Sequence, residues 1–354
     1  MRRTRNPQRR TIDGQRVRVW YGWLCRFSGS LTAYRLEKQL VPEGFARAAD
    51  GTLSHRNRMI RYRDGKHVPR PTLVERAEAL FPGGRALLEH PYWEILDPDR
   101  NVSACADEWL ARLGVDVQRI LFMPRRSVVD FRPARRTLTS VPLRYLEDLG
   151  TFEALAATAL LVREALHAGD ARCARRCAVT FWRLLLVISS SLPFYDVLLN
   201  MAKLADEALL HRVVYRGEQV SLTSVAIWNY ETVLDRYCLV QQMDSTLKPG
   251  HVSWVKARLS MIRGDKGIDL QWAFRLPVVA TSALQADPER HARYLREQTV
   301  RQMAFDYCST DLWQRRSFVD DMMAFFKDPE GRWPCGRYGF GPPSVVRLIG
   351  MSGP

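Results

Sequence analysis

Residues 55–66 concentrate arginine, lysine, histidine and asparagine side chains in a short stretch. Arginine can donate paired hydrogen bonds to guanine and asparagine can do the same to adenine, so this composition suits contact with DNA bases. A helix over residues 55–63, capped by Ser54, would turn Met59 and Tyr62 inward and the polar side chains outward. The candidate nucleic-acid-binding residues in this stretch are His55, Arg56, Asn57, Arg58, Arg61, Arg63 and Lys66.

Two positions in this set are expected to meet the DNA backbone rather than the bases. Arg63 and Lys66 flank Asp64-Gly65, where glycine favours the left-handed conformation that ends a helix. The N-terminal residues add further cations, and basic arms of other DNA-binding proteins follow phosphates or a minor groove. The candidate contacts in this arm are Arg2, Arg3 and Arg5.

Two carboxylate–histidine pairs have the spacing for acid–base or metal chemistry on one helix face. They are Glu164 with His167 and Glu207 with His211. Pairs of this kind are more often surface ion pairs, so we predict neither a catalytic site nor a metal site from them. An enzyme that processes nucleic acid remains an alternative hypothesis, and it would use these four residues.

Several enzyme signatures are absent from the sequence. The chain has no phosphate-binding GxxxxGK[ST] loop, no GxGxxG that opens a helix, no GxSxG elbow and no HExxH pair. We therefore expect no cofactor.

The elements that would position the basic stretch are short helices in the first hundred residues. Residues 31–40, 72–80 and 85–89 show helical spacing of apolar side chains, while residues 17–27 fit either a helix or a strand. We expect residues 1–16 to be a disordered basic arm and residues 17–96 to be the first folded domain.

The rest of the chain is rich in helical spacing, and Gly and Pro residues fall between the helices. The sequence thus predicts an all-α protein, with a small N-terminal helical domain and a larger helical bundle at residues 97–328. A Gly/Pro-rich tail at residues 329–354 follows. The predicted bundle helices are 143–168, 171–190, 194–212, 221–243, 252–262, 283–308 and 311–327, after an amphipathic helix at 103–113 and an irregular connector at 123–142.

Charge is distributed unevenly between these parts. Residues 1–76 carry 18 Lys and Arg against 6 Asp and Glu, a net charge of +12, whereas residues 77–354 carry 35 against 32, a net charge of +3. A basic domain beside a nearly neutral one is typical of a protein that binds a polyanion.

The seven cysteines are irregularly spaced and contain no CxxC pair, which fits reduced thiols in a cytoplasmic protein. The most apolar run, residues 178–192, contains Arg183 and is shorter than the roughly 20 residues of a membrane-spanning helix. We expect a buried core helix there and no contact with a membrane.

Two stretches resemble the Cro/repressor-type helix-turn-helix family. Leu31-Thr32, Leu36-Glu37 and Leu40 are similar to its second helix. Residues 60–66, Pro69 and the apolar residues of 73–80 are similar to the end of its recognition helix and to the helix that follows. The resemblance implies that residues 17–96 form a small N-terminal helix-turn-helix domain and that the helix at 55–63 enters the major groove. The family joins these two helices by a tight turn, whereas residues 41–54 intervene here; either the turn is expanded or the second helix is aligned wrongly.

A weaker resemblance concerns Arg163 and His167, which are similar to the Arg-to-His motif of helical ribonucleases but one residue closer together.

Three functional hypotheses follow from the sequence. The first is a double-stranded-DNA-binding protein, a transcriptional regulator or a mobile-element or phage-related factor, whose helical domain forms a homodimer or binds a protein partner. The second is the nucleic-acid-processing enzyme. The third is a structural component of a larger assembly.

Overall fold

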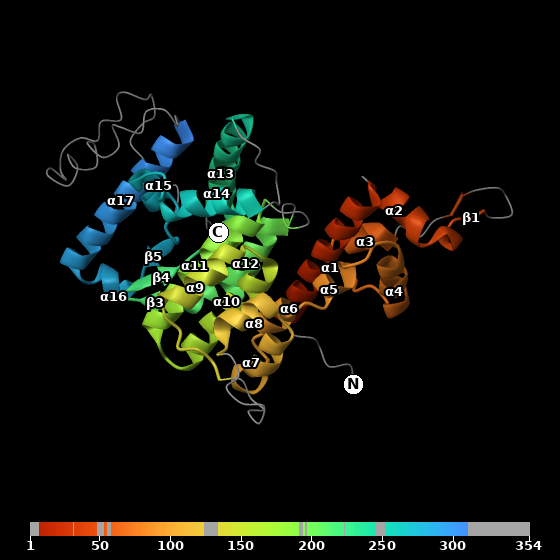
Figure 1. Ribbon diagram of the computed structural model, residues 1–354, viewed down its shortest axis with the longest axis horizontal. Coiled ribbons are helices and arrows are strands. Elements are labelled where there is room, and N and C mark those ends of the chain that lie inside the picture. The colour runs from red at the N-terminus through yellow and green to blue at the C-terminus, as the bar shows by residue number, and fades with distance from the viewer. Residues whose placement is uncertain are drawn as a thin grey trace.

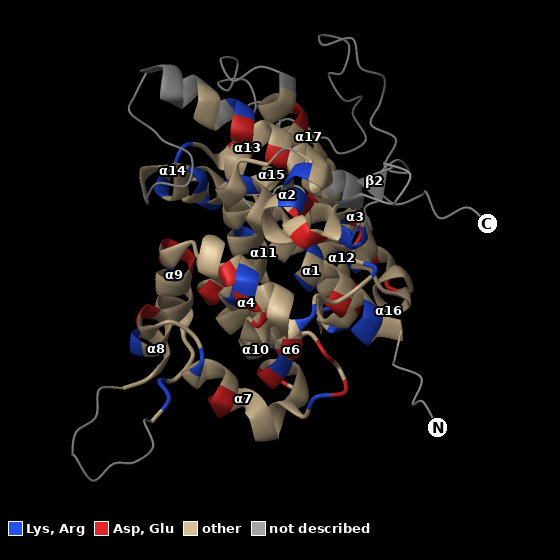
Figure 2. Cartoon of the chain, turned by 90° about the vertical axis from the view of Figure 1, so that its right-hand side faces the viewer, with Lys and Arg blue, Asp and Glu red and all other residues tan. Residues whose placement is uncertain are grey.

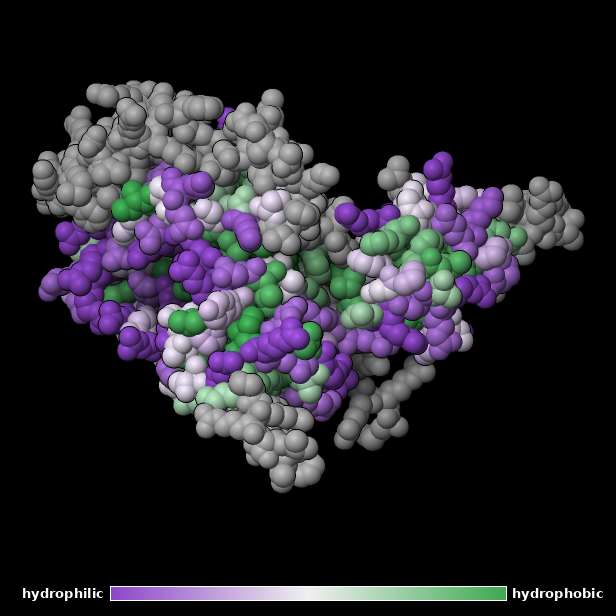
Figure 3. All heavy atoms as spheres, viewed as in Figure 1, coloured by the Kyte–Doolittle hydropathy of each residue, from purple (hydrophilic) through white to green (hydrophobic). Residues whose placement is uncertain are grey.

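The computed structural model describes residues 7–30, 32–47, 53–54, 58–123, 134–190, 194, 197–222, 224–244 and 252–310. This part of the chain is predominantly helical, which confirms the all-α class (Figure 1). Two lobes are visible in Figures 1 and 3. We call the smaller lobe, residues 7–88, the head, and the larger lobe, residues 89–310, the body.

The head is built from helices and one small hairpin. Its elements are α1 (Pro7–Ser28), α2 (Ala33–Leu40), η1 (Pro42–Gly44), β1 (Ala46–Arg47), β2 (Leu53–Ser54), α3 (Arg58–Arg63), α4 (Pro71–Leu80) and α5 (Gly84–Leu88).

The body is a helical bundle with a three-stranded sheet on one side. Its helices are α6 (Pro91–Ile95), α7 (Val102–Ala111), α8 (Val115–Leu121), α9 (Ser140–Leu149), α10 (Phe152–His167), α11 (Ala171–Ile188), α12 (Leu198–Ala208), η3 (Leu210–Arg212), α13 (Ser224–Asp244), α14 (Val252–Arg263), α15 (Ile268–Ala273), α16 (Ser282–Gln285) and α17 (Pro288–Thr310). Its strands are β3 (Val214–Tyr215), β4 (Glu218–Val220) and β5 (Val278–Ala280), paired antiparallel in that order.

Helix α1 contributes to both hydrophobic cores. Val17, Trp20 and Leu24 are buried in the core of the head, whereas Ile12 and Val19 are buried in the core of the body. The prediction of a disordered arm to residue 16 is therefore wrong for residues 7–16, which form the first turns of this helix.

The border between the lobes also lies earlier than predicted. Leu88 belongs to the head core, but Tyr92, Trp93 and Ile95 of α6 pack in the body core. Residues 91–96 are therefore part of the body, because their aromatic side chains pack against Phe152 of α10.

The chain between α2 and α3 holds the turn η1 and the strands β1 and β2. The two strands pair as an antiparallel hairpin, with Ala46 opposite Ser54. Tyr34 of α2 packs edge-on against Phe45 at the start of this segment, with ring centroids 5.2 Å apart. The described residues between α2 and α3 thus contain a short pair of antiparallel strands.

Two of the predicted body helices are divided by local backbone geometry. The helix predicted at 143–168 ends at Gly150, whose φ of +58° belongs to the left-handed region, and Thr151 caps α10. The helix predicted at 283–308 is divided into α16 and α17. The predicted helix at 311–327 and the tail at 329–354 lie outside the described residues.

Helices α10 and α11 occupy the centre of the body. Eleven of the 16 residues of α10 are buried, so this helix is apolar on nearly every side. Helix α11 buries Phe181, Trp182 and Leu185. The predicted core helix at residues 178–192 is therefore confirmed as far as Ile188, the last residue of α11.

Candidate nucleic-acid interface

Helix α3 is held in the head by two inward-facing side chains. Met59 is fully buried and Tyr62 is 8% exposed, and the Tyr62 ring lies edge-on to Trp20 of α1 at 5.9 Å between centroids. Arg61 and Arg63 are exposed on the outside of the same helix. The predicted division of this helix into an apolar and a basic face is confirmed for its described residues.

The N-terminal end of α3 is fixed by a carboxylate from α2. The side chain of Glu37 is buried and accepts hydrogen bonds from the backbone N–H groups of Arg58 at 3.1 Å and Met59 at 3.5 Å. These N–H groups have no partner within the helix, and an acidic side chain also suits the positive end of the helix dipole. Glu37 therefore sets the position of α3 on α2.

The C-terminal end of α3 is fixed by α1. The guanidinium of Arg18 donates to the backbone oxygen of Asp64 at 3.0 Å. Gly65 has a φ of +67°, and a Cβ atom built there would lie 2.6 Å from the backbone oxygen of Gly14. Both glycines are needed for this close approach, because a side chain on Gly65 would be strained and would collide with α1.

The cations on and after α3 differ in whether they form ion pairs. Arg63 and Lys66 both form ion pairs with the Asp64 carboxylate, at 3.1 and 3.0 Å. In the part of the chain that the structure describes, Arg58, Arg61 and Arg70 pair with no carboxylate. The head faces the viewer in Figure 2, where Lys and Arg are drawn in blue.

The guanidinium groups of Arg58, Arg61 and Arg70 all act electrostatically on one side chain. Burial raises the pKa of the Tyr62 hydroxyl, and the positive charges of Arg58, Arg70 and Arg61 oppose that effect. Arg58 and Arg61 are three residues apart on α3, and Arg70 ends the loop that follows it.

Part of the predicted DNA-contacting set cannot be placed. Arg58, Arg61, Arg63 and Lys66 are in the described part of the head. The candidates outside the described residues are His55, Arg56, Asn57, Arg2, Arg3 and Arg5.

Sequence reasoning missed two residues of this surface. Arg70 precedes Pro71, the first residue of α4, and lies outside the helix on which the sequence search concentrated. Glu37 is 21 positions before Arg58, so no local pattern indicates that its carboxylate caps α3. Only the packing of α2 against α3 brings the two together.

The two side chains of the first carboxylate–histidine pair have different partners in the structure. Glu164 forms an ion pair with Arg135 at 2.5 Å, whereas His167 hydrogen-bonds Ser103 at 2.9 Å. Arg163 donates to the backbone oxygens of Ile95, Asp97 and Arg100, so its guanidinium holds the end of α6 and the loop after it on α10.

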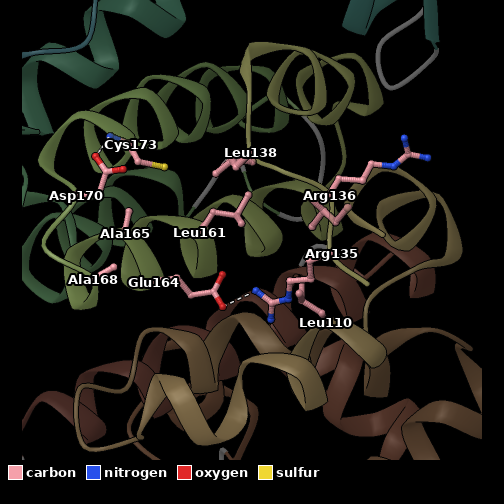
Figure 4. A pocket seen from close by; sticks show the side chains of 11 residues that line it. Leu110, Arg135, Arg136, Leu138, Leu161, Glu164, Ala165, Ala168, Asp170 and Cys173 are labelled. Atoms are coloured by element: carbon pink, nitrogen blue, oxygen red, sulfur yellow. Dashed lines mark hydrogen bonds and ion pairs between the residues drawn. The ribbon is translucent and has the colours of Figure 1, made fainter. Parts of the chain in front are cut away.

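Glu164 lines a pocket of about 250 Å³ between α7, α8, α10 and the chain before α9 (Figure 4). Figure 4 shows the dashed contact between Glu164 and Arg135 at one side of the pocket and Cys173 with Asp170 at another. Leucines 110, 121, 138 and 161 supply the apolar part of the wall. The Glu164 carboxylate is thus paired with a guanidinium, and the described residues that line the pocket include no histidine.

The second pair is also separated. Glu207 is exposed and lies 3.7 Å from Lys203, while His211 is held by the backbone oxygen of Asp206 at 2.7 Å. The neighbouring carboxyl of Asp206 is partly buried, and this burial raises its pKa to about 6. Its Oδ1 atom accepts a hydrogen bond from the N–H of Leu222, so it joins α12 to the end of β4.

Within the described residues, no group of three or more His, Cys, Asp or Glu side chains is arranged to bind a metal ion. None of the helices described is both long and apolar enough to cross a membrane. No protein-family model, curated protein or solved structure matches the chain.

Proposed function

We propose that the chain binds double-stranded DNA through the head, with α3 and residues 64–70 against the duplex. The observation that carries the proposal is the set of arginines Arg58, Arg61 and Arg70, which form no ion pair among the described residues and lie on and just after a helix fixed at both ends. Arginine suits this role because its planar donors match both phosphate oxygens and guanine.

The net charge of the head supports the same partner. Residues 1–76, which include most of the head, carry a net charge of +12, while residues 77–354 carry +3. A polyanion approaching the protein would therefore be attracted to the head rather than to the body.

Salt dependence gives the expected size of the effect. Each phosphate contact releases counterions and adds about 0.9 to the slope of log affinity against log salt. If all three uncompensated arginines contact phosphates, their share of the slope is about 2.7, which corresponds to roughly a 40-fold loss of affinity between 50 and 200 mM salt.

The test is fluorescence anisotropy of a labelled mixed-sequence duplex across a salt series. We expect Arg61→Gln and Arg70→Gln each to weaken binding and to lower the slope by about 1. The matched control is Arg119→Gln, which removes the same charge from the body at a side chain that is 75% exposed. Absent binding, or equal slopes for the head variants and the control, would overturn the proposal.

The body would then serve self-association or binding of a protein partner. A homodimer would present two heads to paired half-sites, as helix-turn-helix proteins commonly do. Light scattering of the protein alone and with a duplex tests this arrangement, because a dimer on DNA requires two chains per bound duplex. A transcriptional or mobile-element factor fits these features better than a nuclease, since neither carboxylate–histidine pair converges in the structure.

A further inference from the structure

The pocket beside Glu164 has a wall that is mainly apolar (Figure 4). Its volume is about 250 Å³, and the four leucines of the wall are joined by Ala165 of α10. The pocket is open to solvent on one side, since Ala168 and Asp170 of its lining are exposed. An apolar cavity of about 150 Å³ is already large enough to bind benzene. This pocket therefore has room for a molecule of one or two rings.

The guanidinium of Arg135 at one side of the pocket is already engaged by carboxylates. Its Nε and Nη2 atoms donate to Oδ1 of Asp107 at 3.1 and 2.6 Å, and its Nη1 atom donates to Oε1 of Glu164. The second arginine of the lining, Arg136, donates from Nε to the backbone oxygen of Phe122 and points away from Glu164 in Figure 4. An anionic ligand would therefore find no unpaired cation directed into the pocket.

Two carboxylate oxygens of the lining accept no hydrogen bond from the described residues. Glu164 receives Arg135 at Oε1, and its Oε2 atom is left over. Asp170 caps α11 by accepting the N–H of Cys173 at Oδ1, at 2.8 Å, and its Oδ2 atom is left over. Figure 4 shows these two carboxylates at different sides of the pocket. The pocket thus combines an apolar wall with hydrogen-bond acceptors at two places on its lining.

We propose that this pocket binds a small, mainly apolar molecule that carries an N–H or O–H donor. The leucines would bury its apolar part, and the donor would bind the remaining oxygen of Glu164 or of Asp170. A hydrogen bond to a charged partner is about twice as strong as one between neutral groups, so the donor contributes to affinity as well as orientation. Binding sites for small molecules commonly have this composition, an apolar lining with a few polar atoms. The pocket is in the body, so the inference is independent of DNA binding by the head.

The thiol of Cys173 can report on occupancy, because this side chain lines the pocket. Cys25 and Cys105 are partly exposed as well but are not in the lining, so they serve as controls within the same molecule. The test alkylates the full chain with iodoacetamide, with and without indole, and follows each cysteine by peptide mass spectrometry. Indole at ten times its dissociation constant should slow alkylation of Cys173 about tenfold and leave the two controls unchanged. No slowing at Cys173, or equal slowing at all three thiols, would overturn the proposal.

Two relatives of indole test the chemical class of the ligand. 1-Methylindole keeps the rings but has no N–H donor, so we expect it to bind about fivefold more weakly than indole. Indole-3-carboxylate adds a negative charge and should not protect Cys173 at the same concentration, because Glu164 and Asp170 would repel it. Equal protection by 1-methylindole would overturn the role of the donor, and protection by the carboxylate would overturn the exclusion of anions.

A pair of variants tests the location of the site. Ala168→Trp introduces a large side chain at an exposed residue of the lining and should abolish the protection of Cys173 by indole. Ala292→Trp is the matched control, the same change at an exposed position of α17, and it should leave the protection intact. Both positions are at the surface, so both variants should fold. Protection that persists in Ala168→Trp, or is lost equally in the control, would overturn the placement of the ligand in this pocket.

Discussion

Replacing Glu37 with alanine should destabilise the head and loosen α3. The side chain of Glu37 is 2% exposed, and its carboxylate accepts the N–H groups of Arg58 and Met59. Loss of a helix cap costs about 1 kcal/mol, and a buried donor left without an acceptor costs about 1–3 kcal/mol. Because water can reach part of the site after truncation, we expect a total of about 2–3 kcal/mol.

The short length of α3 makes this contact important. Isolated helices below roughly 12 residues are marginal in water, and α3 spans only Arg58–Arg63. Its order must therefore come from tertiary contacts, of which Glu37 supplies those at one end.

Two measurements follow the effect of Glu37→Ala. Urea unfolding of the full chain gives the change in the free energy of unfolding, and hydrogen exchange reports on the backbone amides of Arg58 and Met59. A loss of about 2 kcal/mol corresponds to about 30-fold faster exchange if these amides open locally. Glu75→Ala is the matched control, a glutamate of α4 that is 61% exposed, and it should change stability by less than about 0.5 kcal/mol.

The result that would refute this reasoning is unchanged exchange at both amides in Glu37→Ala. A loss of stability equal to that of the control would also refute it. If α3 contacts DNA as proposed, Glu37→Ala should weaken duplex binding as well, although it removes no positive charge.

Three further predictions concern other parts of the structure. Gly65→Ala should destabilise the protein more than Gly29→Ala, since both have positive φ but only Gly65 would place a Cβ atom against α1; equal unfolding temperatures would contradict this. Arg258→Met should cost about 3–5 kcal/mol, because it leaves Glu231 buried beside no cation, and the double variant with Glu231→Leu should recover much of that loss in urea unfolding. Asp206→Asn should stabilise the protein above pH 6 by about 1–2 kcal/mol, after allowance for partial solvent screening. The folded carboxyl titrates near 6 and the unfolded one near 3.8, so wild-type stability falls as pH rises through that window; equal pH profiles of unfolding for the variant and the wild type would refute the assignment.

The face of α3 could be predicted from sequence because it depends on local periodicity. Met59 and Tyr62 are three residues apart, which places them on one side of any helix that contains them. The outward position of Arg61 follows from the same spacing. The ion pairs of Arg63 and Lys66 with Asp64 could also be predicted, since all three residues are near neighbours in the chain.

The extent of α1 could not be predicted in this way. Residues 7–16 are rich in Arg and Gln, and their composition resembles that of a disordered arm. They are helical because Ile12 is buried against the body, a contact between segments far apart in sequence. The strands β3 to β5 were missed for a related reason, since each is only two or three residues long and shows no alternation to detect.

The carboxylate–histidine pairs show the limit of spacing arguments about chemistry. Helical spacing correctly placed Glu164 and His167 on one helix, but their partners come from elsewhere in the chain. Arg135 is 29 residues before Glu164 and Ser103 is 64 residues before His167. Such partners decide whether a side chain is available for chemistry.

By itself, the sequence determined the all-helical class, the basic head and the inward residues of α3, because these depend on composition and on spacing along one helix. The tertiary structure decided which charged side chains form ion pairs and which do not. Glu37 became the cap of α3, and Arg175 was left with an unsatisfied donor, through contacts with residues distant in sequence. The energies of these groups depend on burial and on the charges around them, and both are set only when the chain has folded.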